Sequence, residues 1–329
     1  MRKYIIKRIL FSIVILFFVT LIIYTLIRCL PTSYVETMAM QLATKPGSKP
    51  YQEWLDQLNA SYGLDQPIPV GYVHWLKDFF TGNFGDSWRF TVPVVEEFKS
   101  VIGVSFIMGA IVLVLELLIS IPLGVLAATK QYSKTDYIVS ASALVGISLP
   151  TFFFATILKL IFAVKLGWFD THGMVGRNFA QLDDIGQLLD KCRHLVLPIA
   201  TLTIGSIGSL MRYTRTNMLE VLNADYIRTA RAKGVSESKV IYRHAFRNTM
   251  IPLVTIIGGS LPGLFSGALI TETLFSIPGI GYASYQAMVA GDIPFTMFYL
   301  TFIAILTLAG NLISDILYAV VDPRVRITA

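Results

Sequence analysis

The side chains that could catalyse a reaction or bind a metal are scattered through this 329-residue sequence. No two histidines have the helical spacing of a pair of metal ligands, so no metal site is expected from His74, His172, His194 and His244. The nearest approach to a nucleophile elbow, Gly258–Pro262, has proline where the final glycine should stand. The G-x-x-x-x-G-K-S/T phosphate loop does not occur. The sequence therefore predicts neither an enzyme nor a cofactor bound by this chain.

One acidic residue, Glu116, stands in the middle of the long apolar run Val101–Thr129. A carboxylate at that depth in a membrane is a functional candidate by default, because a charge in hydrocarbon is costly. It could contact the ammonium group of a substrate or relay a proton. Burial against a neighbouring helix, with the carboxyl protonated or hydrogen-bonded, explains the residue equally well.

A second candidate element has a glycine at every fourth position within the apolar run Ile251–Glu272. Gly259, Gly263 and Gly267 are predicted to share one helix face, where small residues allow a neighbouring helix to approach closely. Lining a pore is the alternative role. Pro262 predicts a kink in the same helix, and a kinked, closely packed helix would be a gate element.

These residues need elements to position them, and the composition indicates membrane helices. The chain is 54% hydrophobic and only 15% charged, whereas a soluble domain carries roughly 25% charged residues. Six apolar runs approach or exceed the roughly 20 residues that cross a bilayer: Ile9–Leu30, Val101–Thr129, Ile138–Lys165, Leu195–Tyr213, Ile251–Glu272 and Phe295–Val321. The first run is too long for a signal peptide and lacks a cleavage site. The predicted fold class is an all-α polytopic membrane protein with six transmembrane helices.

The distribution of basic residues predicts the orientation of these helices. With the N-terminus inside, most of the 27 lysine and arginine residues lie in inner segments, as the positive-inside rule requires. Both termini are then cytoplasmic. The net charge of +6 suits anionic lipid, because the basic residues do not form one patch with interleaved aromatic residues, as a nucleic-acid partner would need.

The long first outer loop, residues 31–100, is predicted to form an ordered external cap, since a structureless loop of that length would be unusual. Tyr51–Tyr62 and Tyr72–Phe80 are predicted to be short helices within it. Cys29 and Cys192 are expected to be two unlinked thiols, although the topology places both near the outer face, where one bridge remains open.

The inner segment Arg212–Met250 is the most basic part of the chain. Tyr226–Lys233 is predicted to be a two-turn helix with Asn223 or Asp225 as its N-cap. Gly234 follows where a helix needs a residue with positive φ. Ser236 is predicted to cap a second helix, which runs to Phe246. An ordinary basic loop held to anionic lipid is the alternative.

The residue strings in and around this segment resemble those of a known family, the dipeptide/oligopeptide/nickel permeases of ABC importers. The resemblance covers nearly the whole chain and rests on strings in the same order: Tyr62–Pro67, Gly82–Ser87, Pro93–Val94, Asp225–Gly234, Arg243–Asn248, Ile251–Pro252, Glu272–Gly281 and Asp315–Arg324. The general importer motif begins Glu-Ala-Ala and continues to a glycine. Ala230 and Gly234 match this motif, whereas Arg228 and Thr229 stand in place of its Glu and first Ala. The motif also has a proline after the glycine, and Pro252 comes five residues later than that proline would.

This resemblance implies a type I ABC importer permease fold with an external loop domain, in a bacterial plasma membrane. Its expected parts are a first transmembrane helix over 1–30, an external cap over 31–100, a transmembrane domain over 101–321 and a cytoplasmic tail over 322–329. Segment 212–250 would be the coupling loop, in which Ala230 allows close approach and the arginines pair with carboxylates of an ATPase. Its expected docking residues are Asp225, Arg228, Thr229, Ala230, Arg231, Gly234, His244 and Asn248.

The resemblance also implies the partners: a second homologous permease, two cytoplasmic ATPase subunits that bind ATP and Mg²⁺, an external peptide-binding protein and a peptide substrate. No nucleic acid is expected. Nickel-chelate, glutathione, opine or haem import stays open within the family. Outside it, a proton-coupled secondary transporter that uses Glu116 remains the alternative.

Overall fold

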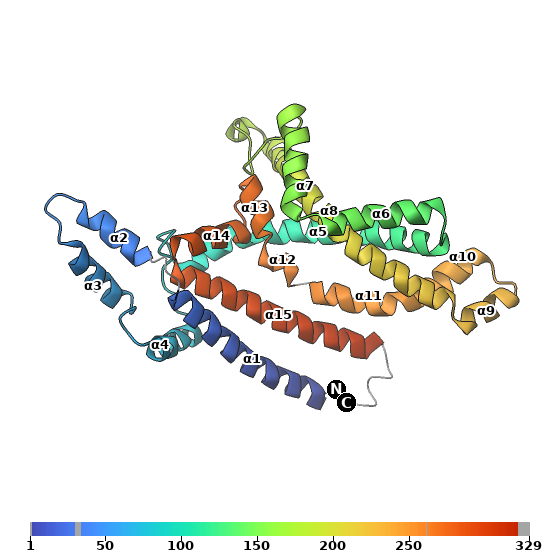
Figure 1. The fold of residues 1–329 in the computed structure, drawn as a ribbon, viewed down its shortest axis with the longest axis horizontal. Helices are drawn as coiled ribbons and strands as arrows, with labels where there is room; N and C mark the ends of the chain where they lie inside the picture. Colours follow the sequence, from blue (N-terminus) through green and yellow to red (C-terminus); the bar gives the residue numbers. More distant parts are fainter. Residues whose placement is uncertain (1, 30–33, 261, 322–329) are drawn as a thin grey trace. The chain divides into compact units, whose positions relative to one another are not determined.

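The computed structural model describes residues 2–29, 34–260 and 262–321, so the expected tail 322–329 lies outside the described residues. The described residues are mostly helical, and their extended structure is limited to one isolated bridge between Asp86 and Pro93. Figure 1 shows the helices, labelled and coloured along the chain from the N-terminus in blue to the C-terminus in red. The prediction of an all-α protein is confirmed.

Two compact units make up the chain. Unit 1 contains Val104–Tyr282 and the stretch that begins at Ala309, and unit 2 contains Arg2–Gly103 and Ala283–Leu308. Each has its own buried apolar clusters.

Four described helices are long and apolar enough to cross a membrane. They are α1 (Arg2–Arg28), α5 (Val94–Thr129), α8 (Asp184–Leu222) and α15 (Ile293–Val321). A fifth span is a bent pair, in which α6 (Lys134–Ser148) meets α7 (Thr151–Leu158) and the π-helical turn Lys159–Lys165 at 101°. Pro150 explains the bend, because it pushes the preceding Leu149 into an extended conformation and ends α6 there.

The expected span Ile251–Glu272 is not one continuous helix. The described residues form α11 (Phe246–Ser260), α12 (Gly263–Ser266) and α13 (Leu269–Phe275). Pro262 stands at the start of α12 instead of kinking a longer helix, and Gly267 ends α12 with φ of 73°.

The prediction that Gly259, Gly263 and Gly267 share one helix face is therefore wrong, because the three glycines lie in different segments. Gly259 belongs to α11, Gly263 begins α12, and Gly267 forms the turn before α13.

Unit 2 contains three short helices in the segment expected to form the cap: α2 (Tyr34–Ala43), α3 (Tyr51–Ser61) and α4 (Ile68–Thr81). The first predicted helix is confirmed as α3, and the second lies within α4, which begins earlier because Pro69 is compatible with a first helical turn. Val35 and Ala39 of α2 are fully buried against α3 beside Trp54 and Trp88. The segment is therefore ordered, as expected, but α2 was not predicted.

In unit 1, α8 packs against α6, α7, α11 and α13. A Cβ at Gly208 would lie 2.5 Å from the Ala143 carbonyl oxygen, so this glycine permits the close approach of α8 to α6. After α8 come α9 (Asp225–Ala232), α10 (Glu237–Lys239) and the π-helical turn Val240–Ala245, which continues into α11. Figure 1 shows α9 and α10 as a short hairpin where α8 ends.

Candidate functional site

The hairpin of α9 and α10 has the backbone that the sequence predicts. Gly234 has φ of 74°, its amide donates to Arg231 O at 3.0 Å, and the Val235 amide donates to Ala230 O at 3.2 Å. These two bonds form the Schellman arrangement that satisfies the last carbonyls of a helix. The predicted role of Gly234 as the residue that ends α9 is confirmed.

The predicted caps are wrong in detail. Ala224 occupies the N-cap position of α9 without a side-chain hydrogen bond, and Asp225 is the first helical residue. Asn223 instead donates its side-chain amide to Leu219 O of α8. Ser236 stands at the N-cap of α10, but its side chain makes no cap hydrogen bond. The backbone turn itself satisfies the carbonyls at the end of α9, so α9 and α10 form without those side chains.

A buried apolar cluster attaches the hairpin to two membrane helices. Ile227 of α9 and Val240 after α10 are fully buried against Val125 of α5 and Met218 of α8. Burying an aliphatic side chain of this size contributes about 1.5–3 kcal/mol. The hairpin is therefore packed onto α5 and α8 through side chains, besides its covalent connections.

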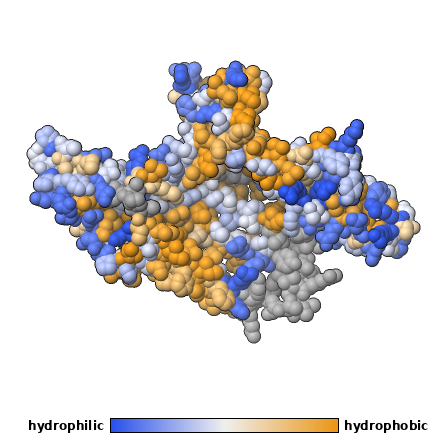
Figure 2. Space-filling view, in the orientation of Figure 1, coloured by the Kyte–Doolittle hydropathy of each residue, from blue (hydrophilic) through white to orange (hydrophobic). Residues whose placement is uncertain are grey.

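Ala230 belongs to the inner face of α9, where it packs against the same cluster. Ala230 is only half-buried, so its expected role in the approach of an ATPase stays a prediction. The outward face of α9 instead carries Tyr226, Arg228 and Thr229, all of them exposed. Figure 2 shows hydrophilic residues gathered over the α9–α10 end of the chain.

The two arginines of α9 have partners within the hairpin. Arg228 lies 3.6 Å from Asp225, with both side chains largely exposed. Arg231 donates to Glu237 of α10 at 2.6 Å, and this hydrogen bond holds the pKa of the Glu237 carboxyl below its usual range. Arg231 is therefore paired across the turn, whereas the weaker, exposed Arg228 pair leaves that guanidinium accessible to a partner.

The other expected docking residues lie on the segment after α10. Asn248 donates its side-chain amide to the His244 carbonyl at 2.8 Å. The Thr229 hydroxyl likewise donates to the Asp225 carbonyl of its own helix. The hairpin brings Asp225, Arg228 and Thr229 together on one short helix, and His244 and Asn248 stand on a separate turn.

A buried ion pair, missed by the sequence analysis, joins α6 to α8 in the same unit. Arg215 donates from Nε and Nη2 to the two carboxyl oxygens of Asp136, both at 2.7 Å. Asp136 is 3% exposed and also accepts from the Tyr132 amide and the Ser140 hydroxyl. Asp136 is one of the few acidic residues in the predicted inner segments, which could have marked it as a partner for a basic residue. The sequence could not identify that partner, because Arg215 is 79 positions away.

A second buried carboxylate organises the segment after α12. Glu272 is fully buried and accepts hydrogen bonds from the Ala268 amide, the Tyr282 amide and the Ser105 hydroxyl. Glycines make room for it, since a Cβ at Gly279 would lie 2.5 Å from Glu272 Oε2. Glu272 is thus a structural clamp, in which one side chain holds the amide at the start of α13 and an amide in the first turn of α14 (Ile280–Ala290).

Glu116 lines a cavity of about 370 Å³ in unit 1. Ser206 of α8 lines the same cavity, and its hydroxyl donates to the Thr203 carbonyl oxygen at 3.1 Å. Ser260 of α11 and the glycines Gly263 and Gly267 line the same cavity. Three residues singled out from the sequence, Glu116, Gly263 and Gly267, therefore line one cavity together with Ser260, although the glycines do not share a helix face.

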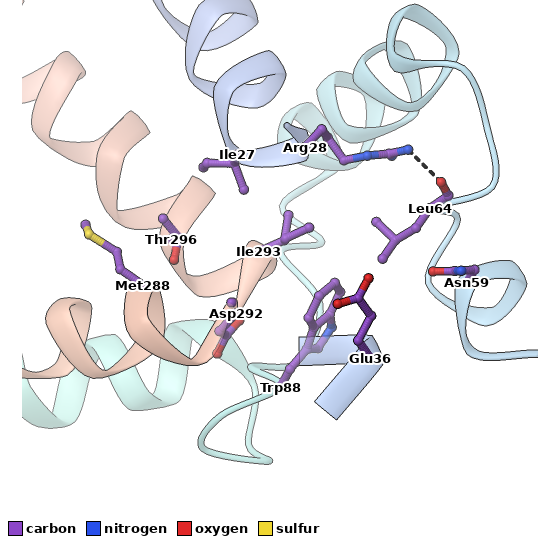
Figure 3. Close-up of a pocket in the computed structure, with 11 residues that line it drawn as sticks. Ile27, Arg28, Glu36, Asn59, Leu64, Trp88, Met288, Asp292, Ile293 and Thr296 are labelled. Carbon is purple, nitrogen blue, oxygen red and sulfur yellow. Dashed lines mark hydrogen bonds between the residues drawn. The ribbon is translucent and has the colours of Figure 1, made fainter. Parts of the chain in front are cut away.

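Unit 2 has a separate pocket of about 250 Å³. Figure 3 shows Glu36, Trp88 and Asp292 gathered on one side of it, while Arg28 points to the Leu64 carbonyl, its partner at 2.7 Å. Asp292 accepts from Ser87 Oγ and from the amides of Arg89 and Phe295. Thr296, 5% exposed, has no hydrogen-bond partner for its hydroxyl among the described residues.

The histidines give no metal centre within the described part of the chain. His194 is buried, with Nε2 3.3 Å from Asp170 and Nδ1 2.8 Å from the Asp190 carbonyl oxygen. Cys29 and Cys192 are exposed cysteines in separate units, and the expectation that they are unlinked stays a prediction.

Comparison with known proteins places this geometry in a family. Residues 120–327 match the family described as "binding-protein-dependent transport system inner membrane component", and residues 1–125 match its N-terminal companion family. The chain is 37% identical over 327 residues to the oligopeptide transport system permease protein AppB of Bacillus subtilis, covering 99% of this chain and 100% of that protein.

Other relatives are equally complete. A putative peptide permease protein of Brucella ovis is 36% identical over 331 residues, the full length of both chains. A probable peptide ABC transporter permease protein of Sinorhizobium fredii is 32% identical over 326 residues, covering 99% of this chain and 100% of the relative. These matches confirm the resemblance seen in the sequence strings: the chain belongs to the family of binding-protein-dependent transport system inner membrane components.

Proposed function

We propose that this chain is the membrane-spanning permease subunit of an ATP-driven importer that carries peptides into the cytoplasm. The observation that carries the proposal is the cytoplasmic hairpin of α9 and α10, packed onto α5 and α8 through Ile227 and Val240. Relatives named as peptide permeases over their full length support the substrate class.

The hairpin has the physical properties of a lever. A partner that moves α9 also moves α5 and α8, because the fully buried Ile227 and Val240 leave no free surface for sliding. ATPase closure would then reach the transmembrane helices as a rigid-body shift. The exposed docking contacts on α9 are Tyr226, Arg228 and Thr229, with Gly234 setting the turn.

The partners follow from this role. The importer comprises a second homologous permease, two cytoplasmic ATPase subunits that hold ATP and Mg²⁺, and an external peptide-binding protein. Both termini of this chain face the cytoplasm of a bacterium, and the chain lies in the plasma membrane. The cap, residues 31–100, lies outside and receives the loaded binding protein, and 101–321 forms the transmembrane domain with its coupling loop at 212–250.

Reconstitution tests this function. Proteoliposomes that contain both permeases and both ATPase subunits should accumulate labelled peptide only with ATP and peptide-loaded binding protein. Arg228→Glu should reduce uptake and ATPase association, whereas Lys130→Glu, at an exposed position after α5 and outside the coupling loop, is the charge control. Peptide uptake driven by a proton gradient without ATPase subunits would instead make the chain a secondary transporter.

A further inference from the structure

Glu116 brings a carboxyl group to a cavity in unit 1. It lies on α5, which has the length and hydropathy of a spanning helix. The cavity is lined by residues of α5 and α8 and by Ser260, Gly263, Leu264, Gly267 and Ala268. A carboxylate inside a membrane protein faces protein or water, because lipid offers it neither a counter-charge nor a hydrogen bond.

The nearest hydroxyl in the cavity lining does not satisfy the carboxyl of Glu116. The Ser206 hydroxyl donates to the Thr203 carbonyl oxygen at 3.1 Å. A hydroxyl has one proton to donate, so this proton is already used within α8. Among the described residues that line the cavity there is no lysine, arginine or histidine. An ionised Glu116 therefore lacks a cationic partner within the cavity lining.

Gly263 and Gly267 contribute to the cavity wall that α12 and the turn after it provide. A Cβ at Gly263 would meet no atom within 4 Å, so space rather than close packing surrounds this residue. Gly267 ends α12 with positive φ and leaves α12 and α13 separated by a turn. The volume of about 370 Å³ falls within the range of about 300–1,000 Å³ that holds small-molecule ligands.

We propose that Glu116 is a specificity-determining contact that accepts an ammonium group of the substrate, an amino terminus or a lysine side chain, as it passes this cavity. The proposal rests on the proposed function as a peptide permease. Gly263, which lines the same cavity without a side chain, leaves room for the ammonium group and its neighbouring atoms. Uncharged substrate segments pass the same cavity without this contact.

Uptake by the reconstituted importer gives the first test, with saturating loaded binding protein so that capture outside the membrane is not limiting. Two peptides are compared that differ only in one internal residue, lysine or norleucine. Glu116→Gln keeps the size of the side chain and removes its charge, and should reduce uptake of the lysine peptide about tenfold relative to the norleucine peptide, a difference of about 1.4 kcal/mol. Glu97→Gln, on the same helix but outside the cavity lining, is the control and should leave the ratio unchanged.

Thiol labelling gives a second test that requires no peptide. In a chain with Cys29→Ser, Cys192→Ser and Ser260→Cys, the cationic reagent aminoethyl methanethiosulfonate is compared with anionic sulfonatoethyl methanethiosulfonate. The ratio of their rates should favour the cation, and adding Glu116→Gln should lower the ratio about tenfold, again about 1.4 kcal/mol. Adding Glu97→Gln instead should leave it unchanged.

The outcomes separate the two levels of inference. Equal loss of both peptides in Glu116→Gln, or no loss, together with an unchanged reagent ratio, overturns the cation contact and makes Glu116 a packing residue. A lowered reagent ratio in a complex that imports no peptide at all upholds the cation-accepting cavity and overturns the peptide assignment. Uptake of both peptides that depends on a proton gradient and is abolished by Glu116→Gln overturns the ammonium contact in favour of a proton relay.

Discussion

Ser105 donates a hydrogen bond from Oγ to Glu272 Oε1 at 2.7 Å, and the same Oγ accepts one from the Ile280 amide at 2.8 Å. The serine thus joins α5 to both ends of the segment that follows α12. Glu272 adds the amides of Ala268 and Tyr282 to the same network. Two side chains therefore hold a broken stretch of backbone in one shape, as buried polar networks do when every member is satisfied.

Removing this clamp should destabilise the chain. Glu272→Ala leaves the Ala268 and Tyr282 amides and the Ser105 hydroxyl without their acceptor, at about 1–3 kcal/mol for each buried donor left unpaired. Glu272→Gln keeps one carbonyl acceptor and should be milder. Thermal unfolding of the purified chain in detergent measures the effect. Glu220→Gln, an exposed position on α8, is the control, and equal melting temperatures for Glu272→Ala and this control would contradict the clamp.

Gly234→Val should impair transport while the chain still inserts. A non-glycine residue with φ near 74° is strained by about 1–2 kcal/mol, and the strain is purely conformational, since a Cβ there would meet no atom within 4 Å. Gly234→Asn should be milder, because asparagine tolerates positive φ. The measurements are peptide uptake and ATPase recruitment at matched expression.

Gly167 offers a matched control for that experiment. It has φ of 63° and equally open surroundings, so Gly167→Val introduces a similar backbone strain outside both the hairpin and the cap. Uptake should fall for Gly234→Val and remain near normal for Gly167→Val. Equal uptake by the two variants would mean that the hairpin is an ordinary basic connection.

Breaking the Asp136–Arg215 pair should lower stability by about 2–3 kcal/mol, less than the 3–5 kcal/mol of a fully buried pair, because the Arg215 side chain is 24% exposed. Asp136→Asn and Arg215→Gln should each have this effect, and the double variant should cost less than the sum of the two. A double-mutant cycle on thermal unfolding measures the coupling. Strict additivity would show that the pair contributes nothing as a pair.

The exposed Arg231–Glu237 pair should respond to acid but not to changes around neutrality. The Arg231 hydrogen bond lowers the pKa of Glu237, so the contribution of the pair is complete above the unfolded pKa of this carboxyl and is lost as pH falls through the lowered folded value. ATPase association should therefore not change through this pair between pH 8 and about pH 6, well above the ordinary glutamate pKa of about 4.3. The measurement is ATPase binding by the wild-type and Glu237→Gln chains across this pH range. If binding changes with pH by the same amount in both chains, the change comes from titratable groups other than Glu237.

Topology can be tested with single cysteines in a background of Cys29→Ser and Cys192→Ser. Lys49→Cys should react with an impermeant thiol reagent in intact cells, and Ser133→Cys and Ser236→Cys should react only after the cells are opened. The physical reason is the excess of lysine and arginine in the segments predicted to lie inside. Labelling of Ser236→Cys in intact cells would reverse the orientation.

The sequence by itself determined the features that depend on neighbouring residues. Apolar runs predicted the long helices, because one stretch of about 20 residues is enough to cross hydrocarbon. Gly234 predicted its own positive φ, and the turn residues around Tyr51–Tyr62 predicted α3 to within one residue, because such preferences act within one or two turns of chain. The resemblance of the strings was sufficient for the family.

Only the tertiary structure decided which distant residues meet. Ser105 and Glu272 are 167 positions apart, and nothing local to either one specifies the other. The inward face of α9 was decided by packing, because the apolar surfaces of α5 and α8 take up Ile227, and Ala230 packs against the same cluster. Even the break within Ile251–Glu272 depends on this level, since the Glu272 carboxylate of α13 accepts hydrogen bonds from the Ala268 and Tyr282 amides, as interrupted backbone in a membrane requires.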